Sequence, residues 1–250
     1  MLKEERHSII ISLLNEKGII KVSDITDIIN VTEMTIRRDL QELDDKGLLK
    51  RIHGGAQLNY SIIEAELSHN EKQTININAK IDIAKKISEL INDGDSVFLG
   101  TGTTIELVYD YLKASYLKIV TNSIHVFNKF VNDQRYELIL IGGSYRNRTG
   151  AFVGSITNDI LSKIKINKAF IGVNGICDNT VSNYNEDEGM IQSTVLNNSS
   201  ERYIIADSTK LDKNDFYHFY NLDDTTAIIT DSNISDENLE RYSQYTKIIY

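Results

Sequence analysis

From about residue 75 to residue 250, short apolar segments alternate with segments whose apolar residues recur at helical spacing. Apolar strands that alternate with helices are typical of a mostly parallel β-sheet with helices on both faces. The alternation therefore predicts an α/β fold with an open, mostly parallel sheet for this part of the chain. The expected strands are residues 96–99, 117–121, 136–143, 168–176, 202–207, 226–231 and 247–250.

The first 57 residues follow a different pattern, in which short helices are closed by glycine and opened by Ser23 or Thr32 as N-caps. The segment LLKRIHGGA (48–56) indicates a strand, a Gly-Gly tip and a return strand. Three helices followed by a small hairpin predict a winged helix-turn-helix. The helices are expected at residues 3–17, 23–29 and 32–46. The domains are expected at residues 1–57 (winged helix-turn-helix), 58–74 (linker) and 75–250 (α/β domain).

Charge and cysteine content limit the classes of function. The formal net charge of -9 disfavours nucleic acid as a partner of the chain as a whole. Residues 1–56 contain 9 Lys/Arg and 10 Asp/Glu, so contact with phosphate there depends on local placement. A single cysteine, Cys177, excludes an intramolecular disulfide and favours a reducing compartment. No signal peptide or bilayer-spanning apolar run is evident, so we expect a cytoplasmic protein without membrane contact.

The third expected helix presents a pair of arginines away from its apolar side. At about 100° per residue, Ile36, Leu40 and Leu43 fall on one stripe that faces the core. Arg38 lies almost opposite this stripe, and Arg37 projects from its flank. Arginine side chains on such a face can read guanine edges or hold phosphate.

The hairpin carries a second basic cluster, where a wing would reach the flanking DNA backbone. Ordinary ion pairs at helical spacing, from Arg37 to Asp44 or from Arg38 to Glu42, are the alternative explanation of the arginine pair. The basic cluster consists of Lys50, Arg51 and His53.

A glycine-threonine loop joins the first expected strand of the α/β domain to the next helix. Glycines let the backbone approach a ligand, and the helix start adds free N–H groups, so the loop suits a phosphate or a sugar hydroxyl. The alternative is a tight strand-to-helix turn. The loop is neither a Walker A motif nor a dinucleotide fingerprint, because Ile105 stands where a third glycine is needed. Its residues are Gly100, Thr101, Gly102, Thr103 and Thr104.

Other candidate ligand residues follow neighbouring strands. Ligands of open α/β sheets gather at the carboxyl ends of strands, so these loops should converge. Arg146 and Arg148 could add a cation for a phosphate, or they are surface charges. The histidines are widely spaced and Cys177 lacks a partner, so no metal site is expected. The residues after the strands are Thr121, Asn122, Gly142, Gly143, Asn174, Asp207 and Lys210.

The segment MTIRRDLQELDDKGLLKRIHGGA (34–56) resembles the signature of the DNA-binding domain of the DeoR family of bacterial repressors. The resemblance covers residues 3–57. It implies that operator DNA is the partner of this domain. It also implies groove contacts from Thr32, Thr35, Arg37 and Arg38, with support from the wing residues Arg51 and His53.

Residues 75–235 resemble the DeoR-family sensor domain, which is itself similar to ribose-5-phosphate isomerase. The motifs are GTGTT, VTN, LIGG, AFVG, FIGVNGI and ADSTK. The resemblance implies a phosphorylated sugar as effector, with its phosphate held by residues 100–104. Lys210 and an acidic residue near Glu188 would meet the sugar. Gln192 departs from the family pattern, since many members carry lysine there, and the placement of the acidic residues 186–188 is left open.

We therefore expect a transcriptional repressor of a carbohydrate operon that a phosphorylated sugar releases from DNA. Asn174 occupies the turn where the isomerases carry carboxylates, and asparagine cannot act as a base, so we expect no enzymatic activity and no cofactor. The alternatives are an isomerase-like enzyme with an appended DNA-binding domain, or an activator. A homodimer or homotetramer is expected. The segment ELSHNEKQT (66–74) resembles repressors of the lactose or tagatose phosphotransferase group within the family.

Overall fold

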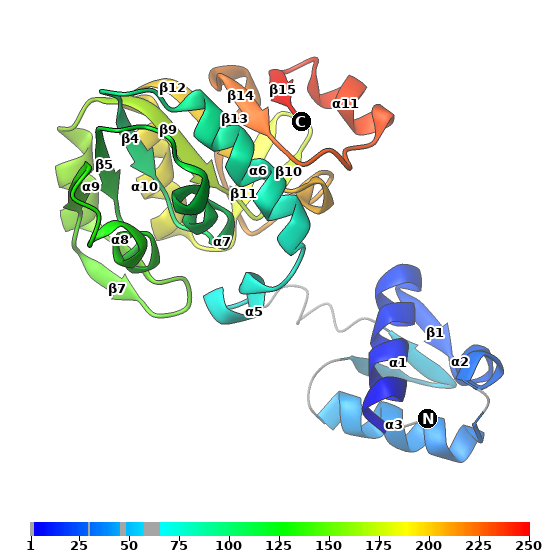
Figure 1. Cartoon of the computed structure of the whole chain (residues 1–250). Helices are drawn as coiled ribbons and strands as arrows, with labels where there is room; N and C mark the ends of the chain where they lie inside the picture. Colours follow the sequence, from blue (N-terminus) through cyan, green and yellow to red (C-terminus); the bar gives the residue numbers. More distant parts are fainter. Residues whose placement is uncertain (1–2, 30, 46–48, 58–65) are drawn as a thin grey trace. The chain divides into compact units, whose positions relative to one another are not determined.

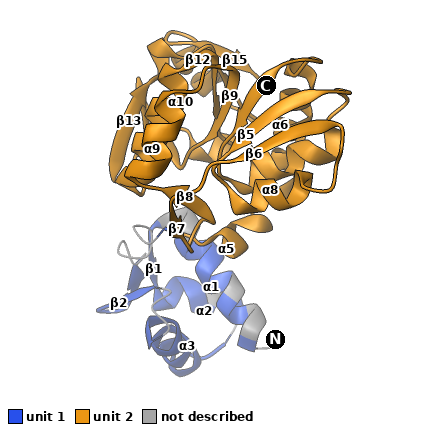
Figure 2. Ribbon diagram, turned by 90° about the vertical axis from the view of Figure 1, so that its left-hand side faces the viewer, with its two compact units in different colours: residues 1–66 blue, residues 67–250 orange. Residues whose placement is uncertain are grey.

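The computed structural model describes residues 3–29, 31–45, 49–57 and 66–250. The chain forms two compact units, residues 1–66 and 67–250, which Figure 2 shows in blue and orange. The helix stop expected at Gly47 and residues 58–65 of the expected linker lie outside the described residues.

The N-terminal unit is a winged helix-turn-helix, as predicted (Figure 1). Its core consists of apolar side chains from all three helices and from the wing, including Ile10, Ile25, Ile36 and Leu40. Ile28 of the second helix is 53% exposed. The elements are α1 (Lys3–Lys17), β1 (Ile19–Lys21), α2 (Val22–Ile29), α3 (Glu33–Asp45), β2 (Lys50–Ile52) and β3 (Gly55–Gln57).

The strand β1 was not expected from the sequence, and it makes the wing a three-stranded antiparallel sheet of order β1-β3-β2. Three residues between two helices carry too short a pattern to reveal a strand. Gly18, with a φ of +72°, ends α1 just before it, and Gly55 lies so close to β1 that a Cβ would meet the carbonyl oxygen of Ile20.

The second unit is built on a seven-stranded sheet whose paired strands are all parallel, which confirms the predicted α/β fold. The strand order is β15-β14-β12-β9-β4-β5-β6. Along the chain, β5 and β6 are added on one side of β4, and β9, β12, β14 and β15 on the other, so the strand order reverses between β4 and β9. Open sheets bind ligands at such a reversal. The strands are β4 (Ser96–Leu99), β5 (Leu117–Thr121), β6 (Tyr136–Leu140), β9 (Ile166–Gly172), β12 (Ser199–Ile205), β14 (Ala227–Ile229) and β15 (Lys247–Ile249).

Helices cover both faces of this sheet (Figure 1). Successive strand side chains point to opposite faces: Val97 and Leu99 pack in one core, and Phe98 packs in the other. The first core includes α6 (Ile77–Leu90), α7 (Thr103–Glu106), η1 (Leu107–Tyr111) and α8 (Ile124–Phe130). The second includes α9 (Ser155–Ser162), α10 (Glu186–Asn197) and α11 (Asp236–Tyr242).

Smaller elements surround the carboxyl ends of the strands. The single strand expected at 168–176 is divided, because β9 ends at Gly172 and the chain turns at Asn174 into an antiparallel sheet. Helix α5 (His69–Gln73) lies inside the range expected as linker, and a capping box between Ser68 and Glu71 opens it. The other elements are the hairpin β7 (Ser144–Arg146) and β8 (Ala151–Val153), the sheet β10 (Gly175–Cys177), β11 (Thr180–Asn183) and β13 (Tyr217–Asn221), and the short helices η2 (Ser208–Lys210) and η3 (Leu222–Asp224).

Candidate functional site

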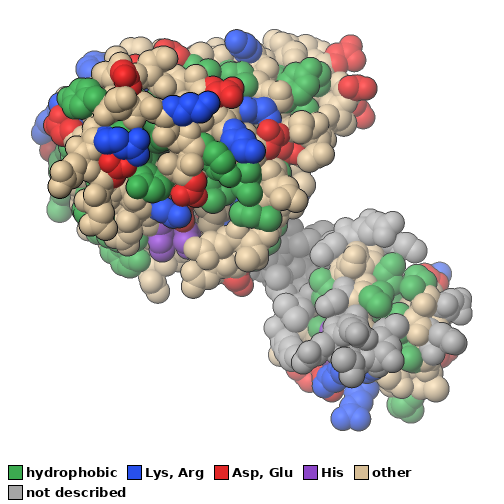
Figure 3. Space-filling view, viewed as in Figure 1, with side chains coloured by type: hydrophobic (Ala, Val, Ile, Leu, Met, Phe, Trp, Pro, Cys, Tyr) green, Lys and Arg blue, Asp and Glu red, His purple; other side chains and the backbone are tan. Residues whose placement is uncertain are grey.

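The exposed face of α3 presents the two arginines to solvent. Ile36 and Leu40 are buried on the opposite side, as the helical spacing predicts. The Arg38 side chain is 83% exposed, and that of Arg37 is 54% exposed. Figure 3 shows Lys and Arg side chains projecting from the side of the N-terminal unit on which α3 lies. At the start of α3, the backbone N–H of Thr35 donates to Oγ1 of Thr32 over 3.4 Å, which is the expected N-cap.

The two arginines form ion pairs on the surface of α3. Nη2 of Arg37 lies 3.1 Å from Oε2 of Glu33, which is an ion pair at helical spacing, although with a different partner from Asp44. Nε of Arg38 lies 3.7 Å from Oε1 of Glu42, the pair that the alternative explanation names. Exposed pairs contribute about 0–1 kcal/mol, so a polyanion can displace them.

Asp39, the acid of the IRRDL segment, has an internal partner. Its carboxylate is 3% exposed and accepts from Nε of Arg6 at 2.7 Å and from Nη2 of Arg6 at 3.0 Å. Burial acts to raise the pKa of Asp39, but the hydrogen bonds and charge of Arg6 outweigh it and hold the pKa below its usual value. Asp39 thus fixes α3 to α1 and leaves Arg37 and Arg38 to the outer face.

The wing places its basic side chains beside α3. Arg51 and His53 are exposed, and Gly54 forms the tip with a φ of +81°. The Arg51 guanidinium donates to the amide oxygen of Gln41, and its backbone N–H donates to Asp44 over 3.4 Å. Arg51 is therefore held close to the exposed side of α3.

In the second unit, the glycine-threonine loop lies directly against β9. The N–H of Gly100 donates to the carbonyl of Phe170 over 3.1 Å, and a Cβ on Gly172 would lie 2.9 Å from the carbonyl oxygen of Thr101. Gly102 has a φ of +135°, which glycine alone adopts readily. Thr103 then begins α7, so the loop sits at the β4/β9 reversal and opens a short helix there.

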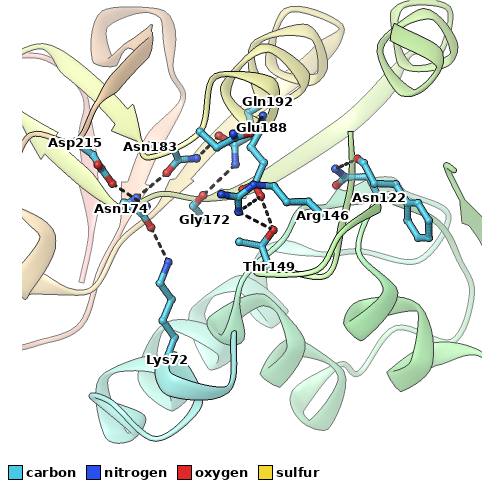
Figure 4. A network of polar contacts seen from close by, with 12 residues as sticks. Lys72, Asn122, Arg146, Thr149, Gly172, Asn174, Asn183, Glu188, Gln192 and Asp215 are labelled. Carbon is cyan, nitrogen blue, oxygen red and sulfur yellow. Dashed lines mark hydrogen bonds and ion pairs between the residues drawn. The ribbon is translucent and has the colours of Figure 1, made fainter. Parts of the chain in front are cut away.

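Asn174 is the centre of a polar network that Figure 4 shows at close range. Its Nδ2 donates to Oδ2 of Asp215 at 2.8 Å, and its Oδ1 accepts from Nζ of Lys72 at 3.1 Å. Its backbone N–H donates to Oδ1 of Asn183 at 2.8 Å, and Asn183 in turn donates to Gln192 at 2.6 Å. Gln192 therefore supports the turn that holds Asn174.

Arg146 joins this region from the hairpin, and Figure 4 shows it directed toward α10. Its Nη1 lies 3.2 Å from Oε1 of Glu188, and Thr149 hydrogen-bonds the same carboxylate. Arg146 is 18% exposed and Glu188 is 8% exposed, so this is a partly buried ion pair and not a surface charge. Arg148, by contrast, is exposed.

Several predicted residues shape the loops and have internal partners. Thr121 is fully buried, and its hydroxyl accepts from the N–H of Ser123 at 3.0 Å. The Asn122 side chain donates to the carbonyl of Phe152 at 2.9 Å and so holds the hairpin (Figure 4). Gly143 has room for no side chain, because a Cβ would lie 2.0 Å from Oγ1 of Thr157, whereas Gly142 is open.

Lysines gather around Asp207 at the end of β12. Nζ of Lys210 donates to the carbonyl of Val173 at 2.5 Å. Burial lowers the pKa of Lys210 to about 8; Asp207 opposes the shift, and the charges of Lys72, Lys80 and Lys213 add to it. Burial likewise lowers the pKa of Lys80, which is 4% exposed and donates to the carbonyl of Lys72. An anion placed here would meet several ammonium groups at once.

Comparison with known proteins places both units in one family. Residues 6–61 match the DeoR-like helix-turn-helix domain, and residues 75–232 match the DeoR C terminal sensor domain. The chain belongs to the DeoR family. The predicted resemblance is thereby confirmed for both parts of the chain.

Several full-length relatives of this DeoR-family chain carry the same name. The lactose phosphotransferase system repressor of Lactococcus lactis subsp. lactis is 43% identical, with 100% of this chain and 99% of the relative covered. That of Streptococcus mutans serotype c is 40% identical, with both chains fully covered. Among solved structures, ribose 5-phosphate isomerase A from Methanocaldococcus jannaschii is similar at a TM-score of 0.39 and 18% identity, over 54% of this chain and 55% of that chain.

The sequence patterns did not identify two lysines of this DeoR-family sensor unit as candidate site residues, namely Lys72 and Lys80. Neither follows a strand, so the strand-end rule does not point to them. Lys80 did carry a signal: it occupies the apolar stripe of α6 with Ile83, Ala84 and Ile87, where a lysine is unusual.

Within residues 3–29, 31–45, 49–57 and 66–250, no three His, Cys, Asp or Glu side chains are grouped so as to hold a metal ion. Over the same ranges, the helices are too short or too polar to cross a bilayer.

Proposed function

We propose that this DeoR-family chain is a DNA-binding transcriptional repressor of a carbohydrate operon, and that a phosphorylated sugar releases it from its operator. The observation that carries the proposal is the combination, in one chain, of an exposed arginine helix and a cluster of lysines near the sheet reversal. Two full-length relatives named lactose phosphotransferase system repressor support a pathway of the lactose type.

On the DNA side, α3 would enter the major groove with Arg38 toward base edges. Arginine forms two parallel hydrogen bonds with guanine, and Arg38 is the more exposed of the pair. Thr32 and Thr35, at the start of α3, would hold phosphate together with the helix N-terminus. Arg51 and His53 would contact the flanking backbone from the wing.

On the effector side, the phosphate would lie against the loop of residues 100–104. Its charge would be neutralised by Lys80 and Lys210, whose burial makes an anionic partner favourable. Asn174, Asp207 and the Arg146–Glu188 pair offer donors and acceptors for sugar hydroxyls. This division assigns the phosphate and the sugar to different groups of residues.

A sensor fits the geometry better than an isomerase. Aldose–ketose interconversion needs a carboxylate free to take a proton. At this site, Asp215 accepts from Asn174, and Glu188 is paired with Arg146. We therefore expect the purified chain to bind sugar phosphates without interconverting them; measurable isomerisation would instead support the enzyme alternative.

Selection of binding sites from a random duplex DNA pool tests the proposal. It is run with and without a mixture of hexose, pentose and triose phosphates. We expect recovery of a repeated half-site motif that is lost in the presence of the mixture. If no sequence is enriched in either arm, the arginines form only a solvated face, and the proposal is wrong.

The same DNA contacts would serve an activator. The sign of regulation depends on where the operator lies relative to the promoter, so a reporter gene behind the recovered site distinguishes the two: repression lowers its expression. A regulator of a bacterial operon acts in the cytoplasm, where we place the chain. It would act as a homodimer or homotetramer.

A further inference from the structure

Two histidines, one from helix α5 and one from helix α8, form a stacked pair in the second unit. The rings of His69 and His125 lie 3.6 Å apart between their centroids, with an angle of 6° between their planes. Nε2 of His69 lies 2.6 Å from Oε1 of Glu106, the last residue of α7. The proposed binding of DNA and of a sugar phosphate uses neither histidine, so the pair needs an explanation of its own.

His69 provides the contacts at the beginning of α5. A helix of five residues has little stability of its own, so contacts with the rest of the unit must hold it in place. His69 is 6% exposed, and its buried Nδ1 has no hydrogen-bond partner among the described residues. Its ring is therefore fixed by Glu106 and by the stacking on His125. Its backbone N–H donates to the carbonyl of Arg148 over 2.8 Å.

His125 is more firmly supported than His69. Ser123 caps α8 just before it, and the N–H of Ile124 donates to the carbonyl of Gly150 over 2.9 Å. A Cβ on Gly150 would lie 2.4 Å from Cδ2 of His125, so the ring lies directly against the backbone of this turn and has no room to move toward it. If the two rings are forced apart, α5 is therefore the element that yields.

The charges around the pair favour one cation and oppose a second. The carboxylate of Glu106 faces His69. The side chains of Lys80 in α6 and Lys129 in α8 also act on this carboxylate. Burial lowers the pKa of the His125 ring below its ordinary value, and the charge of His69 lowers it further. Two imidazolium rings at this separation would repel each other, so the stack is stable when His125 is neutral.

We propose that the stacked pair of His69 and His125 is a proton-sensitive latch, which holds α5 against α7 and α8 while His125 is neutral and releases α5 when His125 takes up a proton. The ligand of this latch is a proton, and its operation requires neither DNA nor a sugar phosphate. Acidification would thus act on the first helix of the second unit, as an input separate from the proposed sugar effector.

The direction of the pH dependence follows from the two groups that titrate. His125 takes up a proton more easily when the latch is open, because its pKa is lowered in the closed state. The latch is therefore closed above about pH 6.5, the ordinary pKa of histidine, and opens progressively as the pH falls below that value. Glu106 acts in the opposite direction, since burial raises the pKa of its carboxyl and so favours the folded state at lower pH. A variant that keeps Glu106 and changes His125 separates the two effects.

Amide hydrogen exchange of the full chain at about pH 7.5 and about pH 5.5 tests the latch. Exchange is followed in residues 66–76, where the N–H groups of His69 and Lys72 are hydrogen-bonded. The reference is His125→Phe, which keeps a stacking ring, cannot take up a proton and leaves the sequence of this segment unchanged. We expect the lower pH to increase the opening of α5 in the wild type by up to about tenfold more than in His125→Phe. The control His218→Phe, which removes an exposed histidine of β13, should behave as the wild type does.

A second measurement requires only the wild-type fold. NMR of the chain with isotope-labelled histidine follows the titration of each imidazole, and the signals of His125 are those absent from His125→Phe. We expect His125 to take up its proton below the ordinary pKa of about 6.5. Exchange in strand β4 should stay constant over the same pH range, because opening of the latch leaves the sheet intact.

The outcomes decide for or against the latch. Faster exchange at low pH that is confined to α5 and absent from His125→Phe supports it. If α5 responds equally in both proteins, or if His125 titrates at or above its ordinary pKa, the pair is only a structural contact. Exchange that rises in β4 together with α5 would mean that acid unfolds the entire unit, and the proposal would be wrong. None of these results alters the proposed function, since the measurements contain neither DNA nor a sugar phosphate.

Discussion

At the scale of single residues, Asp39 decides how the two arginines beside it can be used. Its carboxylate is buried and bound in two places by Arg6, so it has no role on the outer face of α3. The exposed arginines pair with Glu33 and Glu42, and solvent screens both pairs. In α3, Asp39 therefore stabilises the fold, whereas Arg37 and Arg38 remain on the surface.

The first prediction concerns this buried pair. Asp39→Asn should lower the free energy of unfolding of the N-terminal unit by about 3 kcal/mol, because it leaves the Arg6 guanidinium partly buried beside a neutral amide. Urea denaturation of the full chain, followed by circular dichroism, measures the loss. Glu33→Gln, which removes an exposed partner, should cost less than about 1 kcal/mol. Equal effects of the two variants would contradict the account.

Arg38 carries the second prediction. Arg38→Ala should weaken binding to the selected duplex by about tenfold or more, since one bidentate arginine–guanine contact accounts for about 1–3 kcal/mol of discrimination. Arg135→Ala, which removes an exposed arginine of the second unit, is the control and should leave affinity unchanged. Fluorescence anisotropy at fixed salt measures both. Unaltered binding by Arg38→Ala would exclude α3 as the reading helix in this orientation.

The third prediction uses the depressed pKa of Lys210. With a pKa near 8, lowered by burial, Lys210 is mostly charged at pH 7 and loses its proton as the pH rises. A sugar phosphate stays a dianion above about pH 7, since its second pKa is about 6. Affinity for hexose 6-phosphates should therefore fall between pH 8 and 9.5, by up to about tenfold per pH unit. Lys210→Met should bind weakly and with less dependence on pH over this window, and an unchanged slope would contradict this assignment.

At the scale of elements, the backbone conformation of the loop before α7 should affect both stability and the proposed binding of a sugar phosphate. Gly102 needs its φ of +135°, and it supplies the carbonyl that accepts from the N–H groups of Ile105 and Glu106. The fourth prediction is that Gly102→Ala destabilises the chain by about 1–3 kcal/mol and also weakens hexose 6-phosphate binding. Gly142→Ala, at a position with open space around it, should change stability by less than about 1 kcal/mol. Thermal unfolding compares the two.

The elements also show which parts of the fold a sequence can predict. The strands β4, β5 and β12 are apolar on both faces and end in glycine or polar residues, so composition alone located them. The hairpin β7–β8 and the sheet β10-β11-β13 escaped prediction. Their strands are short, and the pairing of β11 with β13 joins segments far apart in the chain. Pairing of that kind leaves no local periodicity.

The candidate effector site was predicted in part for the same reason. Strand ends fixed the loop of residues 100–104, Asn174 and Lys210, because parallel strands bring their carboxyl ends to one edge. Lys72 comes from a short helix whose only local sign is the capping box at Ser68 and Glu71. That Arg146 pairs with Glu188 depends on the unpredicted hairpin, so the sequence left Arg146 undecided between a ligand and a surface charge.

At the scale of the whole molecule, charge argues for more than one DNA-binding unit per complex. Residues 1–56 are nearly neutral, and the rest of the chain carries a net charge of -8. Long-range attraction to DNA is therefore weak, and affinity has to come from a few local contacts. Linking two such units raises the affinity by making the second contact intramolecular.

The fifth prediction follows from this argument. The chain should sediment as a dimer or tetramer, and its selected site should contain two half-sites. A duplex with a single half-site should bind about a hundredfold more weakly. Insertion of about 5 base pairs between the half-sites should weaken binding, because it turns one half-site to the opposite side of the duplex, and insertion of about 10 should restore much of it. A monomer that binds one half-site at nanomolar concentration would contradict the prediction, and the contacts of α3 and the wing would then have to account for the whole affinity.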